Sequence, residues 1–160
     1  LSGAHAIAAA SSQEKLDRLA ALGAHEGINY KTQDFVQALH ASAGKPRIWG
    51  EGGVDMIVNF TGGDTWVPTL KCVRKGGTIL TCGATAGFGP NTDLRYIWTF
   101  ELNIKGSNGW MREDLFRLLE LVGDGRLDPP VDTVLPLRDA PEAFRLLDER
   151  RVFGKVAIVP

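Results

Sequence analysis

The stretch Gly52–Gly63, GGVDMIVNFTGG, decides the fold because its apolar run stops abruptly at a pair of glycines. The centre of this run, Met56–Val58, shows no alternation of apolar and polar residues. This pattern indicates a parallel strand that helices cover on both faces, since a half-exposed antiparallel strand would alternate. Ligands of open α/β sheets bind at the carboxyl ends of such strands. The stretch therefore predicts a buried strand that ends at one edge of a ligand site.

Strands and helices alternate at short spacing on both sides of this strand. Ser12, Asp34 and the sequence Asp139–Glu142 are predicted to begin helices, the last as a capping box with Pro141 in the first turn. Further helices are expected at Trp66–Arg74, Asp93–Phe100 and Arg112–Gly123, and strands at His5–Ala10, Ile28–Tyr30, Thr78–Cys82, Leu102–Gly106, Val134–Leu135 and Lys155–Val159. This order predicts an α/β fold with a doubly wound, Rossmann-like parallel sheet and right-handed crossovers.

Composition excludes several classes of function. The 18 lysine and arginine residues and 19 acidic residues give a net charge of -1, so no basic field would attract nucleic acid or an anionic membrane. The apolar runs are too short to span a bilayer, and no basic segment precedes an apolar signal segment. We therefore expect a soluble, cytoplasmic protein with no nucleic-acid or membrane partner.

Cysteine and histidine spacing indicates neither a metal site nor a disulfide. Cys72 and Cys82 form no pattern typical of zinc ligands, and His5, His25 and His40 are dispersed. No Ser-His-Asp set or carboxylate pair stands out either. The sequence thus nominates no catalytic residue and no metal ligand.

Short motifs along the chain resemble the medium-chain dehydrogenase/reductase superfamily, most closely its quinone-oxidoreductase and zinc-type alcohol-dehydrogenase-like branches. In chain order they are Leu22-Gly23-Ala24, Ile28-Asn29-Tyr30-Lys31, Gly53-Val54-Asp55, Gly62-Gly63, Gly76-Gly77-Thr78-Ile79-Leu80 and Val152-Phe153-Gly154-Lys155-Val156. The resemblance covers nearly the whole chain. It implies a partial dinucleotide-binding domain over residues 1–125 and, over residues 126–160, a segment that returns toward a catalytic domain.

The resemblance also implies parts that this sequence does not contain. Members of the superfamily carry a first strand and a glycine-rich turn upstream of the position of Leu1, and a catalytic part with any zinc ligands. We therefore expect a truncated enzyme in which zinc is possible only through residues not in this chain. The absent first strand would separate His5–Ala10 from Val54–Phe60, so these two segments should not pair directly. Residues upstream of Leu1, the strand Lys155–Val159 or a second copy of the chain would fill the gap.

The resemblance implies a site for NADP at the strand ends. NAD-preferring folds carry an acidic residue after the second strand, where this chain has Ser11 and Ser12, with Lys15 one turn later. A hydroxyl and an ammonium suit a phosphate dianion. The residues alone favour a helix cap at Ser12 and a solvated Lys15, whereas the resemblance favours NADP. The remaining predicted cofactor residues are Tyr30, Thr61, Gly62, Gly83, Ala84, Thr85, Ser107 and Asn108.

Several of these residues also have a structural interpretation that stays open. Tyr30 can be a half-buried strand aromatic, Thr61 and Gly62 an ordinary turn after a strand, and Asn108 with Gly109 a turn dipeptide.

Together these observations predict the cofactor-binding portion of an NADP(H)-dependent oxidoreductase. It would transfer hydride to or from a carbonyl, alcohol or quinone-like small molecule, and this chain alone should have little or no turnover. A homodimer through the edge at Leu102–Ser107 is also expected. The alternatives are a fragment of a zinc-dependent alcohol dehydrogenase and a non-catalytic nucleotide-binding or structural module.

Overall fold

The computed structural model describes residues 2–160, which group by their contacts into two compact units. The first is Ala4–Gly109, and the second contains Trp110–Pro160. The helix α5 (Arg112–Gly123) groups with the second unit. Its apolar residues, among them Leu115, Leu118 and Leu119, are exposed.

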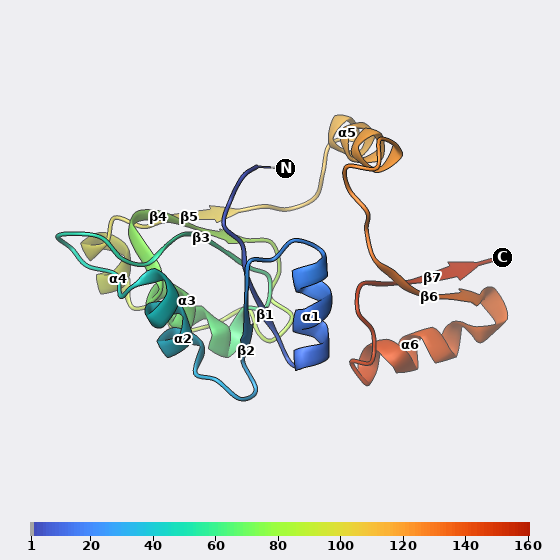
Figure 1. The fold of residues 1–160 in the computed structure, drawn as a ribbon, viewed down its shortest axis with the longest axis horizontal. Helices are drawn as coiled ribbons and strands as arrows, with labels where there is room; N and C mark the ends of the chain where they lie inside the picture. The colour runs from blue at the N-terminus through green and yellow to red at the C-terminus, as the bar shows by residue number, and fades with distance from the viewer. Residues whose placement is uncertain (1) are drawn as a thin grey trace. The chain divides into compact units, whose positions relative to one another are not determined.

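Strands and helices alternate in both units (Figure 1). The first unit contains β1 (Ile7–Ala10), α1 (Gln13–Ala21), β2 (Glu26–Asn29), α2 (Phe35–Ala43), β3 (Val54–Asn59), the 3-10 turn η1 (Gly63–Thr65), α3 (Trp66–Leu70), β4 (Val73–Thr81), α4 (Leu94–Thr99) and β5 (Asn103–Gly106). The second contains α5, β6 (Val131–Pro136), the 3-10 turn η2 (Leu137–Asp139), α6 (Ala140–Asp148) and β7 (Lys155–Val159). None of the helices within residues 2–160 is long and apolar enough to cross a membrane.

All strand pairs are parallel, which confirms the predicted α/β fold. β1 pairs with β2, β3–β4–β5 form a three-stranded sheet, and β6 pairs with β7. Within residues 2–160, β1 and β3 belong to separate sheets, so the expectation that they do not pair directly is confirmed. β7 pairs with β6 in a two-stranded sheet of the second unit.

All three predicted helix starts are confirmed, and at two of them the predicted side chain caps the helix. Ser12 Oγ accepts a hydrogen bond of 3.3 Å from the Lys15 amide, and Asp34 Oδ1 accepts one of 2.8 Å from the Gln37 amide. The predicted capping box at Asp139 is wrong, although Pro141 does lie in the first turn of α6. Asp139 closes η2, and its side chain caps no amide.

The predicted helix Trp66–Arg74 is too long, and the strand after it begins earlier than expected. α3 ends at Leu70, and β4 already starts at Val73. The amide of Val54 donates a 3.0 Å hydrogen bond to the carbonyl of Cys72, and Val73 lies opposite Val54 in the sheet. Pairing with β3 and the complete burial of Val73 thus end the helix.

The core lies on one face of the β3–β4–β5 sheet. Ile57 packs against both buried clusters, one around Leu70, Val73 and Ile79 and the other around Ile28, Leu39 and Cys72. The prediction that β3 is covered on both faces is wrong for the described residues, because Met56 and Val58 are 56% and 51% exposed. α2 and α3 contribute to the clusters on the face of Ile57, and the pleat of a strand turns its neighbours to the opposite face.

Candidate functional site

The carboxyl ends of the strands in the first unit carry every residue that the sequence predicted for a cofactor site. Ser11 and Ser12 follow β1, Lys15 lies in the first turn of α1, Tyr30 follows β2, Thr61 and Gly62 follow β3, Gly83, Ala84 and Thr85 follow β4, and Ser107 and Asn108 follow β5. The structure brings them together as two groups, because β1–β2 and β3–β4–β5 are separate sheets.

The first group lies at the ends of β1 and β2. The amide of Tyr30 donates a 3.1 Å hydrogen bond to the carbonyl of Ala10, which places Tyr30 beside the start of the Ser11–Ser12 turn. The Tyr30 side chain is about half exposed. Ser12 uses its oxygen to cap α1, and its hydroxyl hydrogen can still be donated to a ligand. The capping and phosphate-binding interpretations of Ser12 are therefore compatible.

Asn29 and Gln33 fix the backbone on either side of Tyr30. Asn29 Oδ1 accepts a 3.1 Å hydrogen bond from the amide of Lys31, and Gln33 Oε1 accepts one of 2.9 Å from the amide of Asn29. An Asx turn of this kind restrains the chain without help from a neighbouring strand. Tyr30 thus leaves β2 in a defined direction.

The second group is built by two loops that bond to each other through their backbones. The amide of Ala86 donates a hydrogen bond of 2.7 Å to the carbonyl of Thr61, and the amide of Gly63 donates one of 2.8 Å to the carbonyl of Gly87. The amide of Ser107 donates 2.9 Å to the carbonyl of Thr81, so the end of β5 joins the same edge. Asn108 follows Ser107 in the chain at this edge.

The contact between the loops explains why Gly62 and Gly63 are glycines. Their φ angles are +66° and +49°, a region that residues with a Cβ avoid. A Cβ on Gly62 would lie 2.5 Å from the carbonyl oxygen of Gly87, and one on Gly63 would lie 2.5 Å from that of Ala86. The sequence predicted Gly62 as a cofactor residue, and the structure shows that the neighbouring loop requires a glycine at this position.

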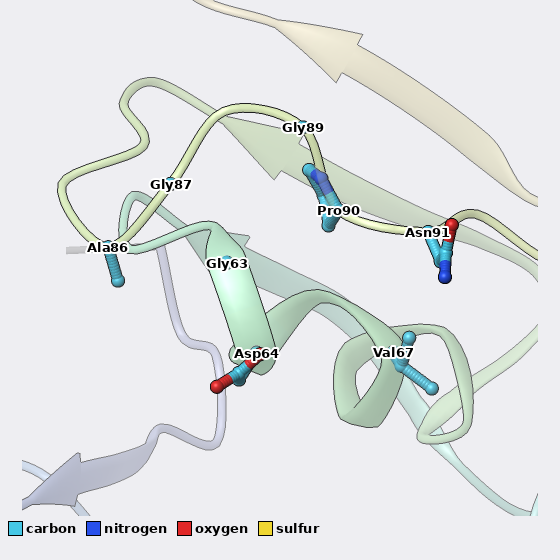
Figure 2. A pocket seen from close by; sticks show the side chains of 8 residues that line it. All are labelled: Gly63, Asp64, Val67, Ala86, Gly87, Gly89, Pro90 and Asn91. Carbon is cyan, nitrogen blue, oxygen red and sulfur yellow. The ribbon is translucent and has the colours of Figure 1, made fainter.

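A hollow of about 560 Å³ opens beside the two loops. Figure 2 shows Asp64 and Val67 extending from η1 and α3 below it, and Pro90 and Asn91 on the segment after β4 above it. Gly63, Ala86, Gly87 and Gly89 complete its lining. Sequence reasoning missed these lining residues, because only the pairing of the loops brings Gly63 to Ala86 and Gly87.

Asn59 is the second feature that sequence reasoning missed. It is the last residue of β3, its side chain is buried, and its amide group bonds to the turn that follows. A polar residue that ends an apolar run directly before Thr-Gly-Gly was the available signal.

The described residues do not fit a zinc ion. Among residues 2–160, no group of three or more histidine, cysteine and acidic side chains lies close enough to hold a metal. Burial raises the pKa of the Cys72 thiol to about 12, with a further contribution from the charge of Asp34. A zinc ligand needs the thiolate form, which this environment disfavours. No step of the chemistry is therefore assigned to zinc in this chain.

Parallel strands that alternate with helices and end in glycine-rich loops define an α/β protein of the Rossmann type. The chain belongs to the zinc-binding dehydrogenase family, whose model matches residues 22–158. The chain is thus a member of the medium-chain dehydrogenase/reductase superfamily, which confirms the resemblance inferred from the motifs.

Curated relatives and solved structures agree with this assignment. The chain is 26% identical to crotonyl-CoA reductase of Streptomyces avermitilis, over 98% of the chain and 38% of that protein. It is 27% identical to quinone oxidoreductase 1 of Escherichia coli, over 99% of the chain and 50% of that protein. The chain therefore spans half or less of the length of these relatives.

Two solved structures share the fold over almost the whole chain. An NAD-dependent alcohol dehydrogenase is 38% identical to this chain, with a TM-score of 0.87. The match covers 99% of this chain and 44% of the alcohol dehydrogenase. A 2-octenoyl-CoA carboxylase reductase, CinF, solved with NADP and 2-octenoyl-CoA, is 28% identical with a TM-score of 0.84. It covers 98% of this chain, which matches 38% of that one.

Proposed function

We propose that this chain is the cofactor-binding portion of an NADP(H)-dependent oxidoreductase. The observation that carries the proposal is the group Ser11, Ser12, Lys15 and Tyr30 at the ends of the adjacent strands β1 and β2. The residues directly after β1 are serines, where an acidic residue would repel a 2′-phosphate. Ser12 retains a hydroxyl hydrogen to donate, and Lys15 follows it by one helical turn. This combination favours a phosphate dianion over a ribose hydroxyl.

Bound NADPH would supply the hydride, and the residues of this chain would hold and orient it. Ser12, Lys15 and Tyr30 would bind the end that carries the 2′-phosphate. The interlocked loops at Thr61–Gly63 and Gly83–Gly87, with Ser107 and Asn108, would form one wall at the nicotinamide end. The substrate, a carbonyl, alcohol or quinone-like small molecule, would require a second wall from elsewhere in a longer protein. We further propose a cytoplasmic enzyme that forms a homodimer through the edge of β5.

The identity of the cofactor is tested by titrating the chain with NADPH and with NADH, followed by fluorescence. The solved relative with 38% identity is NAD-dependent, which makes NAD the specific rival. Tighter binding of NADPH supports the proposal, and tighter binding of NADH contradicts the 2′-phosphate assignment. Binding of neither nucleotide would favour a purely structural module.

Ser12→Asp is expected to reverse the preference from NADPH to NADH while preserving the fold. Aspartate is as good an N-cap as serine, so α1 keeps its cap, but the carboxylate repels the 2′-phosphate. We expect the dissociation constant for NADPH to rise at least about tenfold, which corresponds to about 1.4 kcal/mol. Asp34→Ser is the matched control, because it makes the reverse exchange at the cap of α2, at a residue outside the proposed site. Equal losses in both variants would contradict the role of Ser12.

The isolated chain is expected to show little or no NADPH-dependent reduction of carbonyl or quinone substrates, because it provides one wall of the proposed site. The measurement is the fall in NADPH absorbance with a panel of such substrates. Robust turnover by this polypeptide alone would contradict the assignment of the chain as a cofactor-binding portion.

A further inference from the structure

Asn59 stands out among the described residues as a buried polar side chain beside the proposed cofactor loops. It is 6% exposed, and it bonds at both ends of its amide group. Its Oδ1 accepts hydrogen bonds from the backbone amides of Thr61 at 3.0 Å and Gly62 at 2.9 Å. Its Nδ2 donates to the hydroxyls of Thr65 at 3.1 Å and Thr69 at 2.9 Å.

These partners fix the orientation of the Asn59 amide. Thr65 Oγ1 donates 2.7 Å to the carbonyl of Gly62, and Thr69 Oγ1 donates 2.9 Å to the carbonyl of Thr65. Both hydroxyl hydrogens are thereby used, so each hydroxyl oxygen needs a donor, which Nδ2 provides. With the amide reversed, the NH₂ group would face the amide hydrogens of Thr61 and Gly62, which is unfavourable.

The bonds of Asn59 hold the part of the turn that meets the neighbouring loop. The amide of Thr61 donates a hydrogen bond to Asn59, and the carbonyl of Thr61 accepts one from the amide of Ala86. The amide of Gly62 donates a hydrogen bond to Asn59, and the amide of the next residue, Gly63, donates one to the carbonyl of Gly87. The loops approach so closely that a Cβ does not fit at Gly62 or Gly63. Displacement of the turn would therefore weaken both backbone bonds between the loops.

We infer that Asn59 is a positioning residue that locks the Thr61–Gly63 turn against the Ala84–Gly87 loop and so sets the shape of the nicotinamide-side wall. The inference rests on the proposed function for its link to NADPH. Its structural half, that one side chain controls both loops, rests on the hydrogen bonds within the chain itself.

The test combines amide hydrogen exchange, measured by NMR, with titration of NADPH. In Asn59→Leu, which keeps the branching at Cγ but removes every side-chain hydrogen bond, exchange should accelerate at least about tenfold at Thr61 and Gly62. It should accelerate to a similar degree at Gly63 and Ala86, to which Asn59 makes no bond. Amides at the centre of β4 should keep their protection. The dissociation constant for NADPH should rise about tenfold.

Two further variants keep the test decisive if Asn59→Leu fails to fold. Asn59→Asp keeps an acceptor for both turn amides, so protection at Thr61 and Gly62 should stay within about threefold of the original chain. Thr69→Val removes a buried hydroxyl on the far side of Asn59, and it should leave the exchange of the turn unchanged.

The inference is overturned by any of three results. Exchange could accelerate at Thr61 and Gly62 alone, protection could fall equally throughout the first unit, or NADPH could bind unchanged to a variant with loosened loops. Failure of the original chain to bind NADPH overturns the proposed function instead. The exchange pattern then still decides whether Asn59 controls both loops.

Discussion

Replacing Ile79 with alanine is expected to lower the free energy of unfolding of the first unit by about 2–5 kcal/mol. Ile79 is 0% exposed in the central strand β4, where it lies between Ile57 of β3 and Ile104 of β5. Truncation removes buried methyl and methylene groups, and it leaves a cavity that neighbours on paired strands cannot close. Urea unfolding followed by circular dichroism measures the loss.

Ile104→Ala is the matched control, because Ile104 occupies the same row of the sheet but is 40% exposed on the edge strand. Its truncation should cost about 1 kcal/mol, in line with the smaller apolar area that it buries. Equal losses at Ile79 and Ile104 would contradict the placement of the core on this face of the β4 strand.

Replacing Gly62 with alanine is expected to lower the free energy of unfolding by about 2–3 kcal/mol and to abolish most NADPH binding. Alanine is strained at a φ of +66°, and its Cβ would lie 2.5 Å from the carbonyl oxygen of Gly87. The loops must separate to admit it, which breaks the backbone bonds that join them. Thermal unfolding and nucleotide titration measure the two effects.

Gly89→Ala provides the control, because Gly89 lies on the neighbouring loop after β4, with no atom within 4 Å of its added Cβ and without a positive φ. It should change stability by less than about 0.5 kcal/mol. A Gly62→Ala variant as stable as Gly89→Ala would show that the loops do not meet as described.

Local signals in the sequence predicted the regular elements well. Ser12 and Asp34 were recognised as caps because an N-cap depends only on residues within one turn. The helix Arg112–Gly123 followed from its apolar spacing and is confirmed with the same bounds. The strand ends that carry the candidate site followed from glycines after apolar runs. Each of these signals lies within a few residues of the feature that it predicts.

Predictions that depended on distant partners were the ones that needed correction. α3 is shorter than its spacing suggested because Val73 pairs with Val54. Met56 and Val58 were expected to be buried, but an apolar run does not state which neighbours cover it. The Asp139 cap was wrong because Glu142 pairs with Arg145 and η2 precedes the helix.

The sequence by itself determined the α/β class, the parallel strands, the family resemblance and the residues at the strand ends, because these depend on periodicity and short motifs. Only the tertiary structure decided that Gly62 and Gly63 face the carbonyls of Gly87 and Ala86, and that Asn59 holds this turn. The physical reason is that the turn after β3 and the loop after β4 are joined by backbone hydrogen bonds, which any residue can make and which therefore leave little trace in the sequence.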